Sequence, residues 1–278
     1  MLLSPPELAR LAAIATSRRS AAPGAPGGHR PGPHKGAGSQ FAGHRAYTAG
    51  DDLRMIDWAA FARTDGVFVK EFREEVEGSL QALVDVSASM ARGGKDLAAR
   101  RAAAAAGAVA LMLGDQARIV PFAKGRPIEP RGFAGLREIA DLDRHLEGLE
   151  SGGGPAGLAA ARTILKARRG RVLYVSDLME DEGAGPALIA LRERGHAVTV
   201  AHVLSREETA PPEGFLRLRD SESGEVVEVL VDPETAAAYA RVLEEFCGGW
   251  QTLCASHGMG YVRLLAGQPL SDWADSLC

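Results

Sequence analysis

The sequence predicts an α/β fold in which a mainly parallel sheet carries helices on both faces. Predicted strands and helices alternate between residues 80 and 204, a pattern typical of parallel strands joined by helical crossovers. Residues 80–84 are mostly apolar, which suits a strand covered on both faces. With 46% hydrophobic and 24% charged residues, the 278-residue chain can bury a sizeable core.

Residues 1–38 are expected to form a helix followed by an arm. Ser4 and Glu7 have the spacing of a capping box, with proline in the first turn, and this predicts a helix that ends near Arg19. Residues 21–38 are rich in proline and glycine and hold almost no large apolar side chain. They therefore predict a linker or an extended arm, not a packed element.

The rest of the chain divides at residue 78. Residues 39–77 mix charged and apolar side chains and are expected to pack on the main domain, which spans residues 78–278. The predicted strands cover residues 67–69, 80–84, 117–122, 171–176, 197–204 and 261–265. The predicted helices cover residues 95–114, 135–149, 155–167, 185–194 and 233–257. Residues 215–218 and 226–231 predict a small hairpin appended to the sheet.

Charge, cysteine content and hydropathy narrow the function classes. The net charge of -4 gives no basic surface for nucleic acid. No secretory leader and no apolar run of about 18 residues is recognisable, so we expect a cytoplasmic protein without a membrane segment. Cys247 and Cys254 lie seven residues apart on one predicted helix face and are expected to be buried small hydrophobes, not ligands.

The residues that suggest chemistry follow the strand at 80–84. Asp85, Ser87 and Ser89 occur at every second position, so their oxygens can point the same way along an extended stretch. Asp177 follows the strand at 171–176, at the matching end. Ligands of open parallel sheets bind outside these carboxyl ends, and hard oxygen ligands suit Mg²⁺, Ca²⁺ or Mn²⁺. The pattern predicts a divalent-cation site.

A simpler alternative has equal weight on spacing alone. Ser87 and Ser89 would cap the following helix, and Asp85 would pair with a nearby base. The D-x-S-x-S pattern is too short to decide between the two interpretations.

Resemblance to known families favours the cation site. The run D-V-S-A-S-M at residues 85–90 resembles the metal-ion-dependent adhesion site of von Willebrand factor type A (vWA) domains. There, Asp85, Ser87 and Ser89 would be the ligands of the first loop and Asp177 the late acidic ligand. The upstream run R-A-Y-T-A-G-D-D-L-R-M-I-D-W is similar to the signature of the domain of unknown function 58 family, a bacterial branch of that superfamily. The resemblance implies a vWA-like, Rossmann-type fold.

One position departs from the superfamily pattern. A threonine ligand is normally supplied by a glycine-rich loop, whereas this chain has Pro155 after three glycines at residues 152–154. Proline has no hydroxyl, so we expect weak binding of Mg²⁺ or another divalent cation, or none. Ser151 and Thr163 are possible substitutes, although neither has the expected spacing.

The segment at residues 50–63 has two interpretations, a structural clasp and a binding surface. Carboxylate–arginine pairs beside Trp58 would lock this segment onto the sheet, and we favour that clasp. The charged residues concerned are Asp51, Asp52, Arg54, Asp57 and Arg63.

The sequence shows no catalytic set. Neither glycine cluster has the lysine of a P-loop, and the serines near Asp85 have no evident base in sequence. The resemblance implies a non-catalytic adaptor with a degenerate adhesion site, in which an acidic residue of a partner completes the cation's coordination. It implies a MoxR-type AAA+ ATPase, or a client protein, as that partner. The alternatives are an Mg²⁺-dependent hydrolase or phosphatase using Asp85 and Asp177, and a structural domain with a vestigial site.

Overall fold

The computed structural model describes most of the chain in two compact units. The described residues are 1–20, 29–47, 56–58, 60, 66–124, 128–154, 156–179, 183–219 and 224–278. One unit combines Met1–Ser20 with Ser79–Cys278, and the other is Ala21–Gly78. The N-terminal helix therefore belongs to the larger unit, whereas the sequence grouped it with the arm.

The larger unit is built on one six-stranded sheet. Its strands are β3 (Ser79–Asp85), β4 (Gln116–Phe122), β5 (Arg131–Ala134), β6 (Arg171–Ser176), β7 (Ala197–Leu204) and β10 (Gly260–Leu265). Their order across the sheet is β10-β7-β6-β3-β4-β5. All neighbouring pairs are parallel except β4 and β5, which are antiparallel. The predicted α/β fold with a mainly parallel sheet is confirmed.

The strand order creates a topological switch point between β3 and β6. From β3 the chain proceeds to one edge through β4 and β5, and then returns to the other side of β3 through β6. Ligands of doubly wound sheets bind at this reversal, outside the carboxyl ends of the strands. Asp85 is the last residue of β3, and Asp177 directly follows β6, the other strand that flanks this point.

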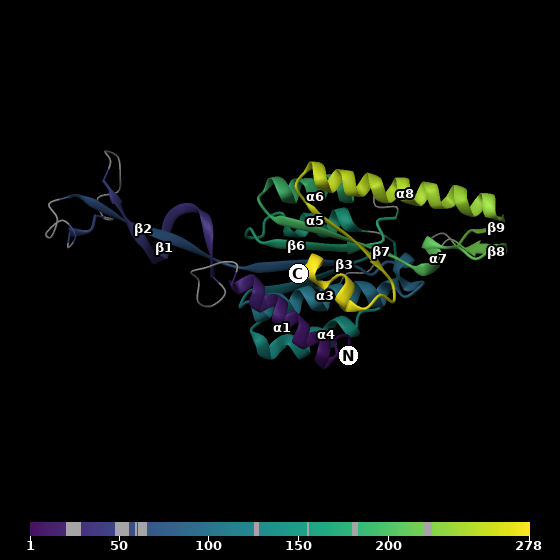
Figure 1. Ribbon diagram of the computed structural model, residues 1–278, viewed down its shortest axis with the longest axis horizontal. Coiled ribbons are helices and arrows are strands. Elements are labelled where there is room, and N and C mark those ends of the chain that lie inside the picture. Colours follow the sequence, from purple (N-terminus) through teal and green to yellow (C-terminus); the bar gives the residue numbers. More distant parts are fainter. Residues whose placement is uncertain are drawn as a thin grey trace. The chain divides into compact units, whose positions relative to one another are not determined.

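Helices cover both faces of the sheet, as Figure 1 shows for the larger unit. The helices are α1 (Pro5–Ser20), α3 (Lys95–Met112), α4 (Ile139–Glu147), α5 (Gly157–Ile164), α6 (Ala184–Glu193), α7 (Arg206–Thr209), α8 (Pro233–Ser256) and α9 (Ala274–Leu277). Helices α1, α3 and α4 lie on one side, and α5, α6 and α8 on the other (Figure 1). Helix α3 is largely buried because a run of alanines from Ala102 to Ala106 lets it lie close to the sheet.

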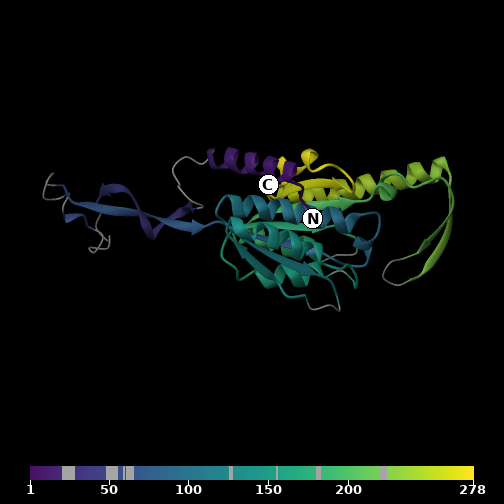
Figure 2. The ribbon, with the colours of Figure 1, turned by 90° about the horizontal axis from the view of Figure 1, so that it is seen from below.

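The hairpin of β8 (Gly214–Arg219) and β9 (Val226–Val231) is confirmed, but it forms a sheet of its own and does not extend the central one. Figure 2 shows it at one end of α8, turning away from that helix. Phe215 pairs with Leu230 across the two strands, and the Phe215 side chain is 87% exposed. The two strands therefore pair although no other described element covers the Phe215 side chain.

The smaller unit contains an antiparallel pair, β1 (His29–Ala46) and β2 (Phe68–Glu77). The sequence predicted no strand before residue 39, whereas β1 begins at His29. Both strands of a two-stranded ribbon are edges, and edges tolerate proline and glycine. The register shifts between Pro31 and Lys35, and twice more before Gly43. The pairing is therefore irregular along the part of β1 that contains proline and glycine.

Only part of the predicted clasp is described. The Asp57 side chain is buried, and its Oδ1 accepts a hydrogen bond from the Ala60 amide at 3.1 Å, as in a capped turn. Trp58 is 64% exposed within the described residues, and its expected packing beside buried charges stays a prediction. Asp51, Asp52, Arg54 and Arg63 lie outside the described residues. The expected packing of residues 39–77 on the main domain stays a prediction.

Candidate metal and interaction site

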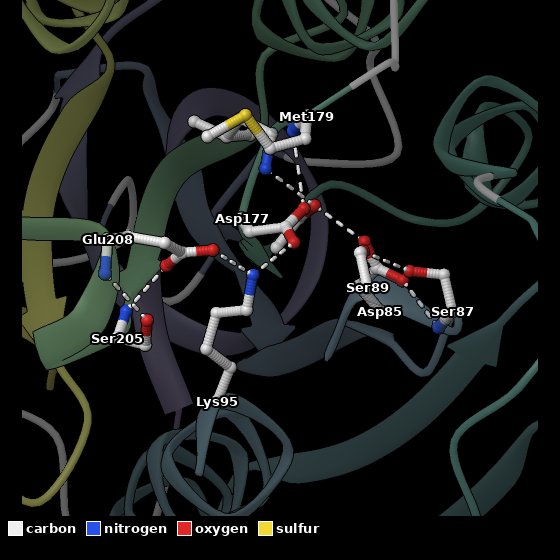
Figure 3. Close-up of polar contacts among 10 residues, drawn as sticks. Asp85, Ser87, Ser89, Lys95, Asp177, Met179, Ser205 and Glu208 are labelled. Carbon is white, nitrogen blue, oxygen red and sulfur yellow. Dashed lines mark hydrogen bonds and ion pairs between the residues drawn. The ribbon is translucent and has the colours of Figure 1, made fainter. Parts of the chain in front are cut away.

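The first loop of the site begins where β3 ends. Asp85 is buried, and its Oδ1 accepts a hydrogen bond from the Ser87 amide at 2.8 Å. Its Oδ2 accepts a hydrogen bond from the Ser176 hydroxyl, at the end of β6, at 2.6 Å. Figure 3 shows Asp85 beside Ser87 and Ser89 of the same loop. The carboxylate is thus fixed from two neighbouring strands.

The two hydroxyls of the loop lie side by side. Ser87 Oγ and Ser89 Oγ are 3.0 Å apart. Neighbouring oxygens around an octahedral Mg²⁺ with bonds of about 2.1 Å are also about 3.0 Å apart. Asp85, Ser87 and Ser89 therefore fit a divalent cation in donor type, and the two hydroxyls fit it in spacing.

The helix-capping alternative is wrong for this loop. Helix α3 has Gly94 as its N-cap residue, and the short 3-10 helix Ser89–Ala91 has Ala88, in each case without a side-chain cap. Asp85 bonds to serines and not to a base. The serine hydroxyls of the loop are consequently not used for capping.

Asp177 lies at the same edge but has a different set of partners. Its Oδ2 is 2.8 Å from Lys95 Nζ, and its Oδ1 accepts a hydrogen bond from the Met179 amide at 3.2 Å. Lys95 Nζ also lies 2.5 Å from Glu208 Oε1 (Figure 3). The fourth predicted ligand is therefore paired with a lysine at the first position of α3.

Burial dominates the electrostatics of the site. Burial raises the pKa of Asp85 to about 6, and the hydrogen bonds from Ser176 and Ser87 only partly oppose it. Repulsion from Asp177 adds a smaller upward contribution. Burial disfavours the charged form of Lys95 as well, but the carboxylates of Asp177 and Glu208 outweigh it and hold the pKa of Lys95 above its usual value. Lys95 is a permanent cation at neutral pH.

The glycine loop lies beside the first loop, as the resemblance implies. The Gly152 amide donates to the Val86 carbonyl at 2.7 Å, and the Ala88 amide donates to the Gly153 carbonyl at 2.8 Å. Pro155, the departure from the superfamily pattern, lies outside the described residues. Thr163 donates its hydroxyl to the Ala160 carbonyl of its own helix at 2.7 Å, which does not support it as a substitute ligand.

Sequence reasoning missed three residues of this site: Ser176, Lys95 and Glu208. Ser176 directly precedes Asp177 in the sequence, and Lys95 is the first residue of the helix predicted at 95–114. Among the described residues, no group of three or more histidine, cysteine, aspartate or glutamate side chains is arranged to hold a metal. The four predicted ligands would not form such a group, because two of them are aspartates and the other two are serines.

The strand order, with an acidic residue at the carboxyl end of each of the two strands at the switch point, defines a doubly wound α/β domain. The model of the family described as "Protein of unknown function DUF58" matches residues 43–245, and the chain belongs to that family. An uncharacterised protein of Mycobacterium tuberculosis strain H37Rv is 29% identical over 223 residues, which are 74% of this chain and 68% of that protein. An uncharacterised protein of Mycobacterium bovis matches with the same identity of 29% over 223 residues, again 74% of this chain and 68% of that protein.

Solved structures are similar at lower levels. The conserved hypothetical protein BatB from Bacteroides thetaiotaomicron has 18% identity and a TM-score of 0.46, over 72% of this chain and 96% of that one. A von Willebrand factor type A protein from Catenulispora acidiphila has 15% identity and a TM-score of 0.33, over 47% of this chain and 40% of that one. The assignment of the fold rests on the strand order and not on these likenesses. Among the described residues, no helix has both the length and the apolarity needed to cross a membrane.

Proposed function

We propose that this chain is a cytoplasmic, non-catalytic adaptor that binds a protein partner at the carboxyl edge of its sheet. The observation that carries the proposal is the pair of hydroxyls of Ser87 and Ser89, 3.0 Å apart beside the buried Asp85 at the switch point. Asp85, Ser87 and Ser89 would hold a divalent cation such as Mg²⁺, with Asp177 as the late acidic residue. A bound cation would offer an open coordination position to a carboxylate of the partner.

The fixed state of the carboxylates supports binding over catalysis. Asp85 accepts hydrogen bonds on both oxygens, and Asp177 is held by Lys95 and by the Met179 amide. A general base has to exchange a proton with its substrate, and a hydrolase needs such a base beside its metal. Carboxylates held by hydrogen bonds in this way suit a fixed binding geometry better than proton exchange with a substrate.

The ion pair between Lys95 and Asp177 favours a second candidate, a structural domain with a vestigial site. In that case the buried lysine replaces the cation permanently, and the edge of the sheet captures no partner. The two candidates differ in one measurable property, which is whether binding of a partner depends on Asp85.

The partner that family resemblance implies is a MoxR-type AAA+ ATPase, or a client protein that such an ATPase matures or assembles. A bound divalent cation would add positive charge to the site, and that charge would attract an acidic residue of the partner. Electrostatic contacts of this kind contribute mainly to specificity and to the rate of association.

The test is capture of a purified MoxR-type AAA+ ATPase by the immobilised chain, in buffer containing Mg²⁺. We expect capture by the wild type, loss of capture with Asp85→Ala, and full capture with Asp141→Ala. Asp141 forms a surface pair with Arg144 on α4, outside the site, so it controls for the loss of one carboxylate. Equal capture by wild type and Asp85→Ala would remove the adaptor proposal at this edge.

A further inference from the structure

Lys95 is a charged side chain buried almost completely. Only 3% of the residue is exposed, and buried lysines are rare unless they are paired. Its two partners are far away in sequence: Asp177 is 82 residues away and Glu208 is 113 residues away. The fold itself therefore places the ammonium group, because α3, the end of β6 and α7 must all be in position.

Glu208 is held in place independently of Lys95. Its Oε2 accepts a hydrogen bond from the Ser205 amide at 2.7 Å, and its own amide donates to the Ser205 hydroxyl at 3.1 Å. These two contacts form a complete capping box at the start of α7. The remaining oxygen, Oε1, faces Lys95 Nζ (Figure 3). One ammonium group thus lies between two fixed carboxylates.

The position of the ammonium affects any divalent cation at the first loop. Asp177 Oδ2 is occupied by Lys95, and Asp177 Oδ1 by the Met179 amide. An ion that approached Asp177 would meet a like charge already in place. Like charges at close range in a buried site repel strongly, because water does not screen them.

We propose that Lys95 is a built-in cation that competes with a divalent ion for Asp177, and that it thereby sets a low cation affinity at the Asp85–Ser87–Ser89 loop. The inference rests on the proposed function, because it assumes that this loop binds a cation. It makes Lys95 a determinant of affinity and Glu208 the carboxylate that keeps the ammonium group buried.

The test is titration calorimetry of Mn²⁺ into the full chain at pH 7. The Lys95→Met variant removes the charge and keeps an unbranched side chain, so we expect Mn²⁺ to bind at least about tenfold more tightly than to wild type. We also expect Mn²⁺ to raise the melting temperature of Lys95→Met more than that of wild type, because the ion replaces the missing positive charge. Lys166 is exposed and lies shortly before β6 begins, whereas the site lies where β6 ends. Lys166→Met therefore removes one positive charge away from the site, and its Mn²⁺ affinity should equal that of wild type.

A second variant covers the case in which Lys95→Met fails to fold. The double variant Lys95→Met, Glu208→Gln removes the ammonium together with one of the two carboxylates that pair with it, and leaves Asp177 in place. Its net charge equals that of wild type, so a gain in Mn²⁺ affinity reports the release of Asp177 and not a change in overall charge. The expected gain is again at least about tenfold.

The outcomes separate this inference from the proposed function. Equal Mn²⁺ affinity in wild type and the Lys95 variants, with binding lost in Asp85→Ala, would overturn the role of Lys95 and leave the cation site intact. No Mn²⁺ binding in wild type or in any folded Lys95 variant would overturn both. Tighter binding in the Lys95 variants that is abolished by adding Asp85→Ala supports both.

Discussion

The Ser176 hydroxyl donates a hydrogen bond of 2.6 Å to the Asp85 carboxylate, and this bond joins the ends of two neighbouring strands. Val84 on β3 pairs with Val175 on β6, so Ser176 lies level with Asp85 in the sheet. Both side chains are buried. The orientation of the first predicted ligand is therefore set by the strand across the switch point, and not by its own loop alone.

Replacing Ser176 with alanine should destabilise the fold. The substitution leaves a buried carboxylate oxygen without its donor, which costs about 1–3 kcal/mol. Urea unfolding at pH 7 measures the change in the free energy of unfolding. The same substitution made in an Asp85→Asn background should cost less, because a hydrogen bond to a neutral amide is weaker than one to a carboxylate. An equal loss of unfolding free energy in the two backgrounds would show that the hydrogen bond between Ser176 and Asp85 does not cause the destabilisation.

The Asp85→Asn variant should change the pH dependence of stability. The pKa of Asp85 is about 6 in the folded chain, above its usual value of 3.8, so the folded state favours the protonated acid. That contribution is fully present below the unfolded pKa and is lost as the pH rises through about 6. Asparagine does not titrate, so the Asp85→Asn variant keeps this contribution at every pH. The unfolding free energy of the variant minus that of wild type should therefore rise by about 3 kcal/mol between pH 3.5 and pH 7.

Urea unfolding of both proteins without divalent cations, at several pH values across that window, checks this prediction. Burial is the main cause of the raised pKa, so we expect the gain to persist in high salt, which screens exposed charges and leaves burial unchanged. A constant difference between the two proteins across the window would contradict a raised pKa.

Gly153 is a position where an added side chain should be costly. Its φ is +82°, and a Cβ atom would lie 2.3 Å from the Lys124 carbonyl oxygen. Gly153→Ala should therefore lower the unfolding free energy by about 1–3 kcal/mol. Gly248→Ala on α8 is the matched control, because a Cβ there meets nothing within 4 Å and alanine favours the helix. Thermal unfolding should show Gly153→Ala below wild type and Gly248→Ala at or above it.

The three cysteines should react slowly with thiol reagents in the folded chain. All three are buried, and burial raises the pKa of Cys254 to about 11 and that of Cys278 to about 12. The thiolate is the reactive form, so its scarcity and its inaccessibility act together. A colorimetric disulfide reagent at pH 8 should modify the thiols only after denaturation. Rapid modification of one thiol without denaturant would show that the structure around that cysteine opens readily.

The central sheet could be predicted because its strands carry strong local signals. The predicted strands at residues 171–176 and 197–204 have the observed bounds of β6 and β7, since each is an apolar run between polar residues or glycine. Strand β5 (Arg131–Ala134) was missed because only Phe133 in it is buried, so the sequence shows no apolar run there. Strand β1 was missed because its first ten residues, at 29–38, have the composition of a linker, with two prolines and three glycines.

The site could be predicted only in part, for a physical reason. Asp85, Ser87 and Ser89 are close in sequence, and the hydroxyls of the two serines do meet. They do not meet along the extended stretch that the spacing predicted, because Ala88 has helical dihedral angles and Ser89 begins a 3-10 helix. The pairing of Lys95 with Asp177 depends on three elements that come together in the fold, and a sequence does not show which charged residue is buried. The signal that was available is a lysine at the start of an alanine-rich helix, directly after the loop of the site.

The most direct test of the cation site is anomalous diffraction from crystals of the full chain grown with Mn²⁺. Data collected at the manganese absorption edge show the position of the ion without any assumption about its ligands. The account predicts an anomalous peak beside Asp85 Oδ1 or Oδ2 and the hydroxyls of Ser87 and Ser89, and no such peak in crystals of Asp85→Ala. Crystals grown in saturating Mn²⁺ that show no peak at this loop, or a peak only elsewhere, would contradict it.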